Sequence, residues 1–158
     1  MSLKLPALNQ PAPAFSAPDQ HGNIVTLDSL RGRNVVLYFY PKAMTPGCTV
    51  QACGIRDHHA EFAALNTLVL GISPDAPQRL QKFIERDQLN FDLLSDEDHA
   101  IADAYGVWAL KKFMGKEFAG ILRKTYLIDP QGTIVKTYND VNPTQHADEI
   151  LRDAQERS

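Results

Sequence analysis

Three consecutive segments near the middle of the chain constrain its fold most strongly. Residues 34–40 and 67–73 are nearly continuous apolar runs, which is typical of strands buried on both faces of a sheet. Between them, residues 49–65 carry apolar side chains among polar ones, and we expect a single helix there. A strand, a helix and a second strand in this order predict a right-handed parallel βαβ unit.

The flanking segments complete an α/β protein. A turn signal at residues 19–23 predicts a small N-terminal hairpin, and the turn at residues 129–132 joins predicted strands at 123–128 and 133–138. We expect helices after Asp75 and Ser95, each acting as an N-cap, and a last helix near residues 144–156. Residues 107–120 are irregular by pattern and rich in large apolar groups. The sequence predicts an α/β sandwich around a central mixed sheet, with an N-terminal hairpin extension and an inserted helix.

Length and composition limit the classes of function. At 158 residues the chain is expected to form one domain, residues 1–158, with a proline-rich extended segment at residues 1–18. Apolar residues make up 44% and charged residues 22%, as in soluble globular proteins. The net charge of -3 gives no reason to expect nucleic acid or an anionic membrane as a partner. Without a membrane span or a signal-peptide pattern, we expect a cytoplasmic protein.

Both cysteines of the chain lie between the first predicted strand and the helix that follows it. Cys48 is placed where a strand turns into a helix, and Cys53 follows on the same predicted helix. Backbone N–H groups are unpaired at a helix start and the helix dipole is positive there, so the position of Cys48 favours thiolate over thiol. A structural disulfide is an unsatisfactory explanation for the pair, because so short a loop constrains little unfolded-state entropy.

The residues around Cys48 form a known motif. Pro41-x-x-x-Thr45-x-x-Cys48 resembles the active-site motif of the peroxiredoxins, and Cys53 at five residues beyond Cys48 resembles their bacterioferritin-comigratory, or Q-type, branch. The resemblance continues through residues 94–96 and 106–108 and through Arg123 ahead of residues 127–129. It spans about residues 5–155 and implies a thioredoxin-like fold.

The resemblance implies a thiol-specific peroxidase that reduces hydrogen peroxide and organic hydroperoxides to water and alcohols. Cys48 would be the peroxidatic cysteine, which attacks the peroxide and becomes a sulfenic acid. Arg123 would activate the sulfur and bind the peroxide oxygen with its planar guanidinium. Thr45 would offer its hydroxyl to the peroxide, and Pro41 would shield the sulfur from water. No metal and no organic cofactor is implied.

Cys53 would be the resolving cysteine, forming an intramolecular disulfide that thioredoxin or a similar dithiol reductant recycles, as in an atypical 2-Cys peroxidase. Glutaredoxin is an alternative reductant. Because the pair is contained in one chain, resolution needs no second subunit and we expect a monomer. Residues i and i+5 of a helix lie roughly 8–9 Å apart at Cα, whereas a disulfide needs less than about 7 Å. We therefore expect the helix to unwind when the disulfide forms.

Two other functions compete with this interpretation. A thioredoxin-like disulfide oxidoreductase is one, although such enzymes usually carry C-x-x-C rather than the C-x₄-C found here. A non-catalytic binding or holdase module is the other, and only the apolar residues 107–120 favour it. Asp57, His58 and His59 invite a metal site, but adjacent helix positions point in different directions, so we expect exposed histidines.

Overall fold

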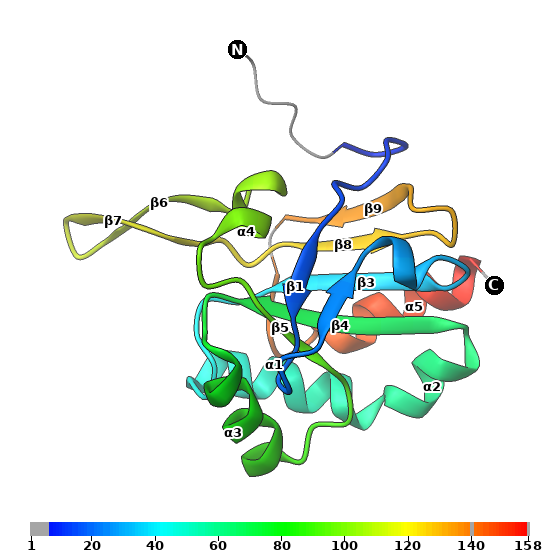
Figure 1. Ribbon diagram of the computed structural model, residues 1–158, viewed down its shortest axis with the longest axis horizontal. Coiled ribbons are helices and arrows are strands. Elements are labelled where there is room, and N and C mark those ends of the chain that lie inside the picture. Colours follow the sequence, from blue (N-terminus) through cyan, green and yellow to red (C-terminus); the bar gives the residue numbers. More distant parts are fainter. Residues whose placement is uncertain (1–6, 140, 158) are drawn as a thin grey trace.

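A five-stranded mixed sheet forms the centre of the molecule (Figure 1). The computed structural model describes residues 7–139 and 141–157. The strand order is β5–β4–β3–β8–β9, with β4 and β5 parallel and β8 antiparallel to β3. Their bounds are β3 (Asn34–Phe39), β4 (Thr67–Ser73), β5 (Leu93–Ser95), β8 (Thr125–Ile128) and β9 (Ile134–Tyr138). The predicted βαβ unit, the mixed sheet and the α/β sandwich are confirmed.

Each face of the sheet carries its own hydrophobic core. One core contains the helices α1 (Pro46–Asp57), α2 (His59–Ala64), α3 (Pro77–Asp87) and α5 (His146–Arg157). The other contains the N-terminal hairpin, the short helix η1 (Asp28–Leu30) and α4 (Ala100–Ala104), as Figure 1 shows. The hairpin pairs β1 (Ser16–Pro18) with β2 (Ile24–Thr26), as predicted. None of the helices in the described ranges combines the length and apolarity that a bilayer crossing requires.

Strand β3 is buried on both of its faces, which explains why its sequence is apolar throughout. Side chains alternate between the two faces of a strand, and β3 sends Val35, Leu37 and Phe39 into one core. Val36 and Tyr38 enter the other core, on the side of α1. All five are 1% exposed or less. The strand that leads to Cys48 is therefore fixed from both sides.

The helix predicted at residues 49–65 is wrong in two respects. It begins earlier, because Pro46 occupies the first turn, where the missing N–H and fixed φ of proline suit a helix start. It also breaks at His58, so that α1 and α2 are separate helices. The His58 ring joins the break to two acidic residues, with Nδ1 2.9 Å from Glu61 Oε1 and Nε2 3.0 Å from Asp148 Oδ1.

The two predicted N-caps are also wrong. The N-cap of α3 is Ala76, because Pro77 takes the first helical position, and the Asp75 carboxylate instead accepts a hydrogen bond from the backbone N of Ala43 at 2.7 Å. This bond ties the loop before α1 to the end of β4.

Ser95 belongs to β5 rather than to a helix start. The helix that follows begins only at Ala100, and the Asp96 carboxylate caps it from the side by accepting bonds from the backbone N of Ile101 and Ala102. The carboxylate is buried, so its hydrogen bonds satisfy both its oxygens inside the protein.

Residues 107–120 form a β-hairpin, where the sequence had shown only an irregular pattern. Strands β6 (Trp108–Phe113) and β7 (Lys116–Ile121) pair antiparallel and project from the body of the molecule (Figure 1). Met114 and Gly115 form the two-residue turn with φ of 52° and 79°, both in the left-handed region that such turns require. Leu110 and Met114 on this hairpin are 72% and 86% exposed.

The N-terminal segment runs along the sheet edge. Residues 1–6 of the predicted extended segment lie outside the described residues. From residue 7 the chain contacts the β8–β9 turn region, with Asn9 N bonded to Ile134 O and Ala12 N to Gly132 O, each at 2.8 Å. The backbone bonds cover part of the edge that β9 would otherwise expose.

A substitution at Gly71 in β4 would test how tightly the core packs around β3 and β5. A Cβ at this position would lie 2.7 Å from Tyr38 Cζ and 2.8 Å from Leu93 Cδ2, both in fully buried side chains. We expect Gly71→Ala to lower the free energy of unfolding by about 1–3 kcal/mol, as overpacked cores do, measured by urea denaturation. Gly54→Ala is the comparison and should not lower the free energy of unfolding, since its Cβ would meet only Ala147 Cβ at 3.4 Å. Equal stability of the Gly71 variant and wild type would contradict the prediction.

Candidate active site

Cys48 lies in the first turn of α1 and is 1% exposed. Thr45 is the N-cap, with the extended backbone (φ -82°, ψ 156°) that lets a chain enter a helix from a loop. The first helical bond runs from Thr49 N to Thr45 O at 2.8 Å. The backbone N–H groups of the preceding residues in this turn have no partner within the helix, so the sulfur lies where the helix offers positive potential.

Arg123 brings a full positive charge to this sulfur. Its Nη2 donates to Cys48 Sγ at 3.1 Å, and its Nη1 donates to Gln51 Oε1 at 2.9 Å. Gly47 makes room for the contact, because a Cβ there would lie 3.0 Å from Nη2. The guanidinium places its positive charge directly against the sulfur, and a thiolate is the nucleophile of cysteine chemistry. Cys48 and Arg123, distant in sequence, therefore form one electrostatic unit.

Gln51 is a site residue that the sequence analysis missed. It is 1% exposed and follows Cys48 by three residues, which places both side chains on the same face of α1. Its carbonyl oxygen holds one arm of the guanidinium fork while the other arm reaches the sulfur. Gln51 shares the buried face of the helix with positions 48, 52 and 55. A polar amide on such a face was the available signal, because a buried amide needs a hydrogen-bond partner.

Thr45 and Pro41 lie at the two ends of the loop before α1. Thr45 Oγ1 donates to the backbone O of Lys42 at 2.8 Å, so in this state the hydroxyl braces the loop. Pro41 lies two residues after the end of β3 and is half-buried. The structure thus places both near the start of α1, while their action on a peroxide remains a prediction.

Cys53 lies further along α1 and is a free, half-buried thiol. Burial raises the pKa of the Cys53 thiol, with Asp87 and Asp57 acting in the same direction and Arg56 opposing them. The two cysteines therefore have contrasting surroundings on one helix. Cys48 contacts a cation, whereas the environment of Cys53 favours the neutral thiol.

Two buried phenols form part of the core beside Cys48. Tyr38 and Tyr40 pack with their ring centroids 5.4 Å apart and belong to the same hydrophobic cluster as Cys48. Burial raises the pKa of Tyr38 well above its ordinary value, so the phenol stays protonated and adds no charge. This wall of the site is therefore uncharged, and the local charge comes from Arg123.

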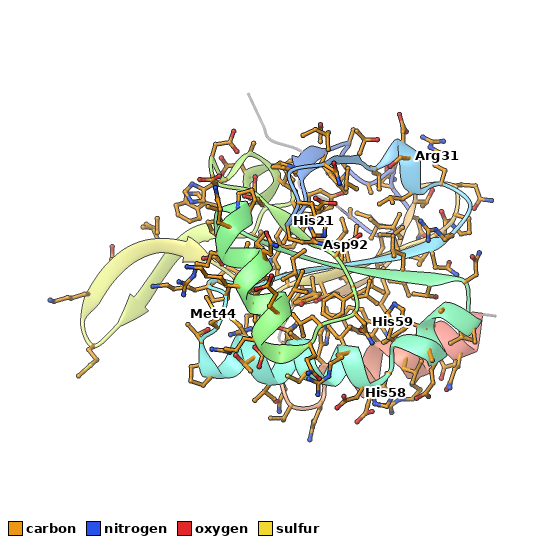
Figure 2. The ribbon with its side chains drawn as sticks, turned by 60° about the horizontal axis from the view of Figure 1, so that its bottom comes forward. His21, Arg31, Met44, His58, His59 and Asp92 are labelled. Carbon is orange, nitrogen blue, oxygen red and sulfur yellow. The ribbon has the colours of Figure 1, made fainter. Side chains whose placement is uncertain are left out.

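His58 and His59, which the sequence predicted to be exposed, are half-buried instead. His58 is half-buried and its hydrogen bond to Glu61 raises its pKa, with the charge of Asp148 acting the same way. Within the described ranges, no three histidine, cysteine or acidic side chains come together as a candidate metal site. His58 acts as a structural contact at the α1–α2 break (Figure 2).

Comparisons with known proteins agree with this geometry. Residues 8–137 match the AhpC/TSA family. The chain is 51% identical over 140 residues to peroxiredoxin Bcp of Escherichia coli (strain K12), covering 89% of this chain and 90% of that protein. It is 44% identical over 151 residues to peroxiredoxin Bcp of Bacillus subtilis (strain 168), covering 96% of each.

A solved structure shows the same fold. The bacterioferritin comigratory protein of Xanthomonas campestris superposes with a TM-score of 0.89 at 31% identity, covering 96% of this chain and 98% of that one. The chain belongs to the AhpC/TSA family. The predicted thioredoxin-like fold and the thiol peroxidase function of a Bcp/Q-type peroxiredoxin are thereby confirmed. Neither the disulfide oxidoreductase nor the non-catalytic module fits these relatives.

The contact between Arg123 and Cys48 gives a testable prediction for this peroxiredoxin. Arg123→Lys keeps the charge but cannot bond the sulfur and Gln51 together, because lysine lacks the planar fork. We expect the rate of Cys48 oxidation by peroxide to fall roughly 100-fold, the usual effect of losing one preorganised donor, in rapid-mixing experiments. Arg33→Lys, an exposed position at the opposite end of β3, is the control. A change of less than twofold in the Arg123 variant would refute the assignment.

Proposed function

We propose that Cys48 is the residue at which this peroxiredoxin reduces hydrogen peroxide and organic hydroperoxides, with Arg123 as its activating group. The observation that carries the proposal is the 3.1 Å contact between Arg123 Nη2 and the buried Cys48 Sγ at a helix start. The X. campestris relative is described as having alkyl peroxide reduction activity, which supports organic hydroperoxides as substrates here as well.

The first step is attack by the Cys48 thiolate on one peroxide oxygen. An S–O bond forms, the O–O bond breaks, and the departing oxygen takes a proton to leave as water or an alcohol. Sulfur loses two electrons and becomes a sulfenic acid. Arg123 and the free backbone N–H groups of the first turn stabilise negative charge as it moves onto the leaving oxygen. Thr45 turns its hydroxyl from Lys42 O to the peroxide, and Pro41 limits access of water.

The second step joins Cys48 to Cys53. The Cys53 sulfur attacks the sulfenic sulfur, an S–S bond forms, the S–O bond breaks, and the hydroxyl leaves as water with the Cys53 proton. On a regular helix the two Cα atoms lie roughly 8–9 Å apart, whereas a disulfide needs less than about 7 Å. The first turns of α1 must therefore come apart before the bond can form.

A dithiol reductant completes the cycle by thiol–disulfide exchange. We propose thioredoxin in this role, with glutaredoxin as the alternative, because an unwound segment exposes its disulfide to attack. We also propose a cytoplasmic location, where free thiols are maintained, and a monomer of one domain that works without nucleic acid or membrane. Two cores sharing one sheet support the single domain.

Intact mass spectrometry after one equivalent of peroxide tests the roles of the two cysteines. Wild type is expected to lose two hydrogens by forming the disulfide. Cys53→Ser should gain one oxygen as sulfenic acid or trap it as an adduct, and Cys48→Ser should show no fast reaction. Fast oxidation of Cys48→Ser would disprove the assignment of the attacking sulfur.

Hydrogen exchange tests the unwinding of α1. Within residues 46–56, we expect the amides from Thr49 onward, which are hydrogen-bonded within the helix, to exchange faster in the disulfide form than in the reduced form, because those bonds are lost. Amides of β3 and β8, which lie in the sheet, should keep the same protection in both forms and serve as the internal control. Equal protection of the helical amides of residues 46–56 in the two forms would contradict the need for unwinding.

A further inference from the structure

An arginine on α3 holds the start of the Cys48 helix. Arg86 Nη2 donates to Thr49 Oγ1 at 2.8 Å, and Arg86 Nη1 lies at a longer 3.5 Å from the backbone O of Met44. Met44 closes the loop before α1, and Figure 2 shows it at the end of the molecule where α1 begins beside α3. One guanidinium therefore connects the loop and the first turn that flank Cys48.

The Arg86 side chain is itself held in place. It forms an ion pair with Asp87 at 2.9 Å, and its guanidinium carbon lies 5.9 Å from the centre of the Phe83 ring. Phe83 is fully buried in the core that also contains Cys48. The bond from Arg86 to Thr49 therefore ties the start of α1 to α3, a helix that is packed into the core.

Two further hydrogen bonds join α1 to the end of α3 and the residues after it, at Arg56, on the C-terminal side of Cys53. Arg56 Nη1 donates to the backbone O of Asp87 at 2.5 Å, and Asn90 Nδ2 donates to the backbone O of Arg56 at 3.2 Å. Cys48 and Cys53 can join if the chain between them rearranges. That rearrangement breaks the Thr49 contact, whereas the Arg56 contacts lie beyond it.

We propose that Arg86 is a positioning residue that keeps the first turn of α1 wound and so sets the balance between peroxide attack and disulfide formation. The inference rests on the roles proposed above for Cys48 and Cys53. With Arg86 in place, Cys48 stays against Arg123 and reacts with peroxide, and the sulfenic acid waits for the turn to open. Without Arg86, the turn opens more often, so attack slows and resolution quickens.

A substitution at Gly54 should have the opposite effect to the loss of Arg86, because it stabilises α1. It lies inside α1 next to Cys53, and glycine destabilises a helix interior relative to alanine. A Cβ at this position would make an ordinary contact with Ala147 Cβ at 3.4 Å. Gly54→Ala should therefore keep the helix wound and slow the formation of the disulfide.

The experiment measures the two steps separately by rapid quenching, alkylation and intact mass. Arg86→Gln is expected to raise the ratio of the disulfide-formation rate to the Cys48 oxidation rate about fivefold, the scale of one partly exposed charged hydrogen bond. Thr49→Val removes the same contact from the α1 side and should act alike, and the double variant should add little. Lys82→Gln, an exposed position on the same helix, is the control.

Three results would overturn the proposal. They are equal slowing of both steps in Arg86→Gln, additive effects of the Arg86 and Thr49 changes, or unchanged exchange of amides 49–51, the first that are hydrogen-bonded within α1, in the reduced Arg86→Gln protein. The exchange measurement needs no turnover and detects the loosened turn directly. If wild type formed no Cys48–Cys53 disulfide, the proposed function would fail instead, so the two failures are distinguishable.

Discussion

The contact between Arg123 and Cys48 sets the geometry of the candidate active site. It joins two parts of the chain that approach from opposite directions, since Cys48 follows β3 and Arg123 precedes β8. The antiparallel pairing of these strands, with Tyr38 opposite Thr125, brings the end of β3 to the start of β8. Gly47 then leaves space for the guanidinium and Gln51 fixes its orientation. Burial of β3 in two cores makes the whole arrangement rigid at its base.

Helix α1 meets two conflicting demands, and its start is built accordingly. The helix has no side-chain cap and no acidic residue in its first turn, although Thr45 stands at the N-cap position. The Thr45 hydroxyl bonds to Lys42 O instead. The backbone N–H groups of the first turn therefore remain available for the peroxide in the proposed reaction, and the same lack of capping makes the turn easier to open. By this argument, a strong cap would stabilise the helix and oppose both proposed steps.

Much of the fold was predictable from sequence because its strongest signals are local. The apolar runs at β3 and β4, the turn before β9 and the cysteine motif each have a physical meaning within a few residues. Failures occurred where tertiary contacts override local preference. Asp75 has the position of a helix cap but bonds the Ala43 backbone across the loop, and Asp96 caps its helix from a distance. The Met114–Gly115 turn was missed because methionine seldom adopts positive φ. Gln51 and Arg86 act through contacts that only the folded chain brings together.

The contacts at the two ends of α1 also explain why a rearrangement of this helix need not disturb the sheet. On the N-terminal side, Asp75 and Arg79 hold both backbone polar groups of Ala43, at 2.7 Å and 2.9 Å. On the C-terminal side, Arg56 is bonded to the end of α3 and His58 to α2 and α5. The chain between these two anchors holds both cysteines and can rearrange while the sheet keeps its hydrogen bonds. Arg123 lies just before β8, outside this segment, so in the proposed cycle a helix that rewinds after reduction would restore the contacts of Arg123 with Cys48 and Gln51.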